Sequence, residues 1–107
     1  MTTVKIDWTK ERLNPHQKVL TAAELRALPA LYSTEDQGDK AKVQVHFFTG
    51  GYDLWATEFS PEEGLFFGKV SLFEVELGYV SVQDLQSVKW MERDLYWTPK
   101  PLSECGK

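Results

Sequence analysis

The stretch that decides the fold is KVQVHFFTGGYDLWATEFSPEEGLFFGKV, residues 42–70. Its first part alternates, so that Val43, Val45 and Phe47 share one face and His46 lies on the other. The turns TGG and SPEEG then separate this segment from two further segments rich in aromatic and aliphatic residues. The stretch therefore predicts three strands in an antiparallel meander.

The second and third of these strands carry more specific expectations. Strict alternation along LWATEF places Trp55 and Phe59 on one face, and Glu58 on the opposite face with Leu54. A glycine inside a strand marks a bulge or a close approach of another backbone, and Gly68 is such a glycine in LFFGKV. We therefore expect a local irregularity near Gly68.

Two capping boxes flank the meander. A Ser or Thr followed three residues later by Glu or Asp satisfies the free amides at the start of a helix. These boxes are Thr21 with Glu24 and Ser81 with Asp84. They predict short helices at about 22–28 and 82–88, the first ending at Pro29.

The remaining segments complete an α+β fold. SLFEVELGY, residues 71–79, fits a short helical turn ended by Gly78, followed by a fourth strand around 78–81. ERDLYW, residues 92–97, predicts a last strand that the following prolines stop, with Arg93 beside Leu95 and Trp97 on a core face and Glu92 with Asp94 on the other. The sum is a mainly antiparallel sheet of four to five strands with two short capped helices.

Composition places the chain among globular proteins of one domain, since 107 residues, 42% of them hydrophobic, suffice for a core. The start of the chain lacks the apolar region of a signal peptide, and no apolar run reaches the length of a membrane span. Cys105 stands alone, which excludes an internal disulfide. We expect a cytoplasmic protein without a membrane partner.

The charge is distributed unevenly. Net charge is −4, and residues 53–86 hold seven carboxylates against the single cation Lys69. An acidic body disfavours nucleic acid and suits a partner with a basic surface. A solvated acidic face that only keeps the protein in solution is the competing interpretation.

One set of side chains offers candidate chemistry. His46 lies on the polar face of the first strand, and the carboxylates of Glu58, Glu92 and Asp94 would reach it if the strands pair suitably. Such a set would bind a divalent metal or act in acid–base catalysis. An ordinary half-solvated sheet face competes with this hypothesis. No phosphate-binding glycine loop or nucleophile elbow is present, and no cofactor is expected.

The aromatic residues, 13% of the chain, are interleaved with acids, which favours core packing and protein contacts over stacking with nucleic acid. The sequence predicts contacts with a protein partner, and a homodimer is the alternative. The candidate binding residues are Glu35, Asp36, Trp55, Glu58, Glu62, Glu63, Glu92 and Asp94.

Several segments occur together in the order of a known family. They are LTAAELRALPALYSTEDQGD, VQVHFFT, LWATEF, LFFGKV, EVELGYVSVQDLQSV and ERDLYWTPKPLSE. Over about residues 20–104 the chain resembles domain of unknown function 2958, a bacterial family also found on plasmids and phages. The resemblance implies a setting on mobile genetic elements and supplies no catalytic residue. Residues 1–19 fall outside it and would form an N-terminal extension of the single domain.

These observations together favour a small acidic accessory protein of a mobile element that acts by binding another protein. A narrower version is an anti-defence protein whose acidic surface occupies the DNA-binding groove of a nuclease or CRISPR effector. The alternative is a small enzyme or metal-binding protein that uses His46 with Glu58, Glu92 or Asp94.

Overall fold

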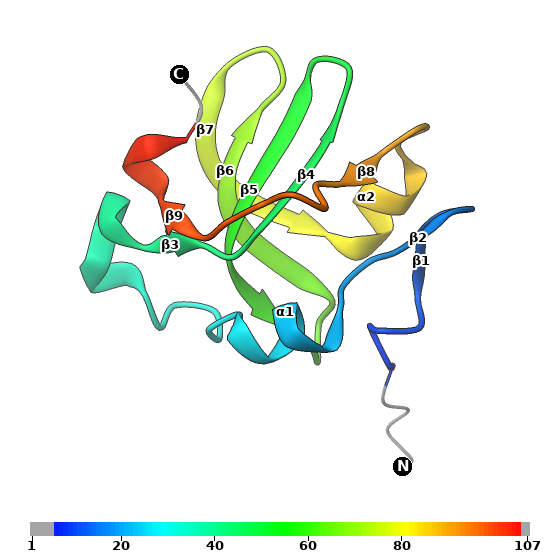
Figure 1. Ribbon diagram of the computed structural model, residues 1–107. Coiled ribbons are helices and arrows are strands. Elements are labelled where there is room, and N and C mark those ends of the chain that lie inside the picture. Colours follow the sequence, from blue (N-terminus) through cyan, green and yellow to red (C-terminus); the bar gives the residue numbers. More distant parts are fainter. Residues whose placement is uncertain (1–5, 106–107) are drawn as a thin grey trace.

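The computed structural model describes residues 6–105 and is organised around one five-stranded antiparallel sheet (Figure 1). Along the sheet the strands follow the order β7-β6-β5-β4-β8. They are β4 (Val45–Thr49), β5 (Tyr52–Ser60), β6 (Leu65–Ser71), β7 (Val75–Ser81) and β8 (Glu92–Arg93). The predicted α+β class and the meander over 42–70 are confirmed.

Shorter elements surround this sheet. Two small antiparallel pairs join β1 (Arg12–Asn14) to β2 (Gln17–Lys18) and β3 (Lys42–Val43) to β9 (Lys100–Pro101). The helices are α1 (Ala22–Ala27), α2 (Val82–Ser87) and the 3-10 helices η1 (Glu35–Lys40) and η2 (Leu102–Glu104). Because β3 pairs with β9, the first predicted strand of the meander is divided at Gln44.

Both predicted capping boxes are confirmed. The Thr21 hydroxyl accepts a hydrogen bond from the Glu24 amide at 3.1 Å, and the Glu24 carboxylate accepts one from the Thr21 amide at 2.8 Å. Ser81 and Asp84 make the same reciprocal pair at 3.0 and 3.3 Å. The first helix ends one residue early, because Leu28, which precedes a proline, adopts an extended conformation.

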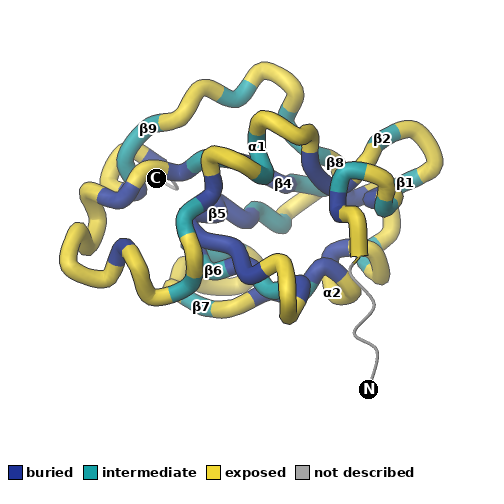
Figure 2. Tube along the Cα trace, turned by 90° about the horizontal axis from the view of Figure 1, so that it is seen from below, coloured by how far each residue is buried: buried dark blue, intermediate teal, exposed yellow. Residues whose placement is uncertain are grey.

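The two faces of the sheet pack against different parts of the chain. On one face, buried side chains such as Phe47, Leu54 and Phe66 form the main core with residues of α2 and of the N-terminal segment. On the other face, Val43 and Trp55 form a second core with residues of the C-terminal segment. Figure 2 shows the resulting contrast between the buried β5 and the largely exposed β7.

The predicted alternation along β5 is wrong beyond Ala56. The register with β6 shifts between Ala56 and Glu58, because one extra residue forms a bulge there. As a result Trp55 lies in the second core while Phe59 lies in the main core. Glu58 accordingly lies on the face opposite to Leu54, and not beside it as expected.

The irregularity near Gly68 is confirmed as a close backbone approach. A Cβ atom on Gly68 would lie 2.0 Å from the carbonyl oxygen of Trp55 and 2.8 Å from the Cα of Ala56. Only glycine fits opposite the bulge, so the two features belong to one local arrangement.

Two predicted elements have different bounds. Residues 75–81 form one strand, β7, which confirms the fourth strand expected around 78–81. The helical turn expected before it is wrong, because the chain turns back at residues 72–74 and pairs along β6. The last strand ends at Arg93, four residues earlier than predicted, because Asp94 begins a turn. Leu95 is exposed and not part of a core.

The predicted N-terminal extension contributes to the main core. Trp8, Leu13 and Val19 are buried there. The Trp8 indole also donates a hydrogen bond to the carbonyl oxygen of Pro61 at 2.9 Å. Residues 1–5 lie outside the described range. Among residues 6–105, no helix has both the length and the apolar character that crossing a membrane requires.

Candidate functional site

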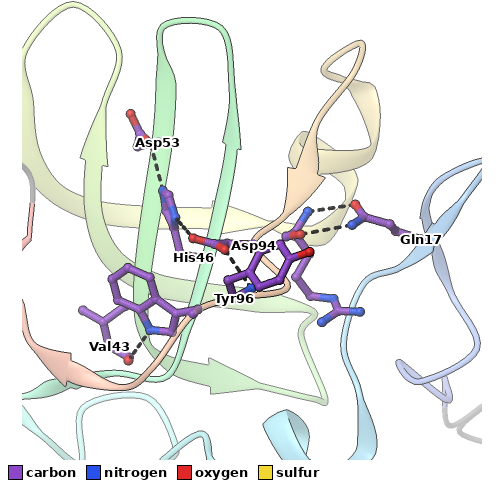
Figure 3. Close-up of polar contacts among 8 residues, drawn as sticks. Gln17, Val43, His46, Asp53, Asp94 and Tyr96 are labelled. Carbon is purple, nitrogen blue, oxygen red and sulfur yellow. Dashed lines mark hydrogen bonds and ion pairs between the residues drawn. The ribbon is translucent and has the colours of Figure 1, made fainter.

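His46 lies between two carboxylates on the face of the sheet that carries the second core (Figure 3). Its Nε2 is 2.8 Å from Asp53 Oδ1, and its Nδ1 is 3.1 Å from Asp94 Oδ2. The ring stacks parallel to the indole of Trp55, its partner across β4 and β5, with centroids 5.3 Å apart. The His46 side chain is only 13% exposed.

The turn after β8 positions Asp94. Its Oδ1 accepts a hydrogen bond from the Tyr96 amide at 3.0 Å, an Asx turn that ends the strand. Its own amide donates to the His46 carbonyl at 2.8 Å. The next aromatic residue, Trp97, donates from its indole to the Val43 carbonyl at 2.8 Å (Figure 3). Asp94 is thus held on both sides of its contact with His46.

The two contacts of His46 hold the turn after β8 against the hairpin of β4 and β5, and they occupy both nitrogens of the ring. A neutral imidazole has one N–H, so both contacts are hydrogen bonds only when both nitrogens carry protons. A metal ion requires an unprotonated nitrogen, and here each nitrogen faces a carboxylate. Across residues 6–105, no group of three or more His, Cys, Asp and Glu side chains has the geometry of a metal site.

The structure divides the predicted set around His46. Asp94 meets the imidazole, as the hypothesis requires, and Asp53 joins it as a partner that sequence reasoning missed. Asp53 follows a hairpin turn and faces Phe48 across β4, which brings it next to His46. Glu92, on β8, pairs with Phe48 of β4 and is exposed. Glu58 does not contact His46 but accepts hydrogen bonds from Tyr32 and Thr34.

Glu58 is a buried carboxylate, 2% exposed, with three hydrogen-bond donors. The Tyr32 amide donates to Oε1 at 2.8 Å, and the Thr34 amide donates to Oε2 at 2.9 Å. The Thr34 hydroxyl donates to Oε2 as well. The bulge in β5 turns Glu58 toward this loop. Through its side chain, β5 therefore holds the segment between α1 and η1 in place.

Beside Glu58 the surface is hollowed by about 170 Å³. Glu58 lines this hollow together with Glu35, Phe67 and Leu77. The other lining residues are Thr34, Gly38, Ala41, Thr57 and Leu102. In the described part of the chain the ion pairs join His46 to Asp53 and Asp94, and Arg93 to Glu24. Glu58 has no cationic partner there.

A row of exposed apolar side chains follows the outermost strand and its hairpin. We call it the edge patch, and its members are Leu72, Phe73, Val75, Leu77 and Tyr79, between 48% and 95% exposed. Tyr32, at φ +70°, places its ring 6.2 Å from that of Tyr79. The sequence signal for this surface was the alternation VELGY, which the expected helical turn obscured.

The pKa values of Tyr79 and Cys105 are shifted from their ordinary values. Desolvation raises the pKa of Tyr79, and a hydrogen bond with Tyr32 and the charges of Glu35 and Glu58 raise it further. Burial raises the pKa of the Cys105 thiol, although the cations of Lys100 and Lys69 oppose this shift.

The other candidate binding residues are scattered. Trp55 is buried and belongs to the second core. Asp36 is exposed on η1, next to Glu35. Glu62 and Glu63 are exposed in the turn between β5 and β6, at the opposite end of β6 from the edge patch.

Comparisons with protein-family models, with curated proteins and with solved structures found no match to this chain.

Proposed function

We propose that this protein acts by binding another protein, in the cytoplasm, as a small acidic accessory protein of a mobile genetic element. The observation that carries the proposal is the edge patch. The setting on a mobile element follows from the resemblance to domain of unknown function 2958 and remains part of the proposal.

The edge patch has the features of a docking surface. Strand β7 ends the sheet, so half of its backbone donors and acceptors face away from β6. Its sequence, VELGYVS, has neither the lysine nor the proline that proteins use to protect an edge strand. Phe73, at the tip of the hairpin, is 95% exposed. Contiguous exposed apolar side chains of this kind mark interaction sites.

The charge of this protein indicates which kind of partner surface would suit it. The segment 53–86 holds seven carboxylates, and its one cation, Lys69, donates from its ammonium to the carbonyls of Leu102 and Cys105 at 3.0 and 2.9 Å. Of these carboxylates, Glu74 and Glu76 are exposed among the residues of the patch, and they favour a partner with a basic surface. Nucleic-acid-binding proteins have such surfaces, which supports the narrower proposal of an anti-defence protein that occupies the groove of a nuclease or CRISPR effector.

A capture experiment from host lysate tests the proposal. We expect the unmodified protein to retain a basic protein at low salt and to release part of it at high salt. The double variant Phe73→Ser and Val75→Ser should lose this protein, because it removes apolar contacts without disturbing a core. Tyr96→Ser is the matched control, since Tyr96 is 94% exposed outside the patch. Equal retention by all three proteins would contradict the proposal.

A further inference from the structure

We propose that the hollow beside Glu58 binds a lysine or arginine side chain of the partner protein. This inference rests on the proposed function and adds a recognition site to it. Four features support it: a buried carboxylate without a cation, a free acceptor position, apolar walls, and continuity with the edge patch.

Glu58, which lines the hollow, is a carboxylate without a positively charged partner in the described part of the chain. Glu58 is buried, and hydrogen bonds from neutral donors compensate only part of the cost of removing a carboxylate from water. A carboxylate offers about four lone-pair positions, and Tyr32 and Thr34 together fill three. The fourth position, on Oε1, remains for an incoming N–H donor.

The walls suit the aliphatic part of a basic side chain. Phe67 and Leu77 line the hollow, while Glu35 stands exposed at its rim. Lysine and arginine bury their methylene stems against apolar surface and keep the charged end near acceptors. A volume of about 170 Å³ is smaller than the roughly 300–1,000 Å³ of sites for drug-sized ligands. One long side chain is therefore a better match than a free metabolite.

The protein does not supply this cation from the neighbouring strand. Lys69 pairs with Leu77 across β6 and β7, so it lies on the same face as the hollow. Its ammonium is held by the carbonyls of Leu102 and Cys105, which fix the C-terminal segment. Moving it to Glu58 would break both hydrogen bonds, so Lys69 is not available to Glu58.

The hollow and the edge patch form a continuous surface, because Leu77 belongs to both. A partner that covers the apolar side chains of β7 would thus bring its own side chains to the opening. The apolar contacts would supply affinity, and one basic side chain would fix the position of the partner.

The test uses three capped pentapeptides in which alanine and valine flank a central lysine, arginine or norleucine. Each is titrated into the ¹⁵N-labelled protein, and backbone amide shifts are followed. We expect the lysine and arginine peptides to shift the amides of Thr34, Gly38 and Leu77 in a saturable way. Norleucine has the same stem as lysine without the charge, so its peptide should leave these amides unchanged.

Variants locate the interaction. Glu58→Gln should weaken binding of the cationic peptides by about tenfold or more, as expected for the loss of a charge-assisted hydrogen bond. Glu35→Gln should weaken it by a smaller factor. Glu62→Gln removes the same charge from the distant turn and should bind as the unmodified protein does. If Glu58→Gln fails to fold, Glu35→Gln and the norleucine peptide decide the outcome.

Several results would overturn the inference. They are equal binding of the norleucine peptide, shifts that map elsewhere, and unchanged affinity in folded Glu35→Gln and Glu58→Gln. If the amide shifts at the hollow instead changed with the concentration of the protein alone, the hollow would bind a second copy of this chain, and the inference would again be overturned. None of these results affects the capture experiment, whose variants leave the lining of the hollow intact, so a failure of this inference can be distinguished from a failure of the proposed function.

Discussion

At the scale of single residues, His46 shows how a polar side chain can mark a structural contact. The imidazole lies between Asp53 and Asp94, and Trp55 stacks on its ring. The sequence suggested that Asp94 would reach His46 if the strands paired suitably, and the two side chains lie 3.1 Å apart. It could not identify Asp53, because that contact depends on the register of β4 against β5.

We expect Asp94→Ala to lower the free energy of unfolding by about 1–2 kcal/mol, because it removes a contact of the largely buried His46 and the Asx turn. Asp94→Asn retains an acceptor for the Tyr96 amide and should lose less. Urea denaturation of both variants measures the difference. Equal losses would mean that the hydrogen bond from the Tyr96 amide contributes nothing.

Cys105 gives a second prediction at this scale. Burial raises the pKa of its thiol above the ordinary 9.0, so the thiolate is scarce in the folded protein. A thiol reagent should therefore react slowly with the native protein at about pH 8 and quickly in concentrated urea.

The same shift affects stability in alkaline solution. Because the folded thiol holds its proton more tightly, the unfolded thiol ionises first as the pH rises above 9.0. This contribution to stability is complete below that pH and is lost above it. Cys105→Ser should reduce the fall in unfolding free energy, and an identical alkaline profile would refute the assignment.

At the scale of elements, features set by neighbouring residues could be predicted from the sequence, whereas a feature set by strand pairing could not. The caps at Thr21 and Ser81 were predictable because each involves residues three apart. The bulge in β5 was not, because it arises from the pairing of Ala56 and Glu58 with β6. One extra residue reversed the face of every side chain after it, so Glu58 lies on the face of Trp55 and His46, but further along β5 and bound to Tyr32 and Thr34.

Gly68 is the residue that this pairing requires. Gly68→Ala should lower the free energy of unfolding by about 3 kcal/mol or more, because its methyl group would meet the backbone of Trp55. Gly78, its cross-strand partner on β7, has open space where a Cβ would stand, with no atom within 4 Å. Gly78→Ala is thus the matched control, and it should change stability by less than about 1 kcal/mol. Similar losses in chemical denaturation would contradict the role of Gly68.

At the scale of the whole molecule, the fold class followed from the sequence because turns and capping signals separate the elements clearly. The exposed edge patch could not be predicted. Alternation along a strand identifies the two faces of the sheet, but it does not show how much of each face other segments cover. The C-terminal segment covers Trp55 and Val43 on one face but leaves β7 exposed. The edge patch is therefore a consequence of tertiary coverage, which the alternation VELGY does not show by itself.

The order in which the chain is synthesised gives the C-terminal segment a further consequence. The main core uses residues up to Met91, so all of its residues have been made before the second core can be completed by Leu102 and Cys105. Leu102 also lines the hollow. During translation the sheet can form first, and the hollow is completed only after residue 102 has left the ribosome. The pocket proposed for a basic side chain would therefore be completed after the main core, whereas the side chains of the edge patch are made before Met91.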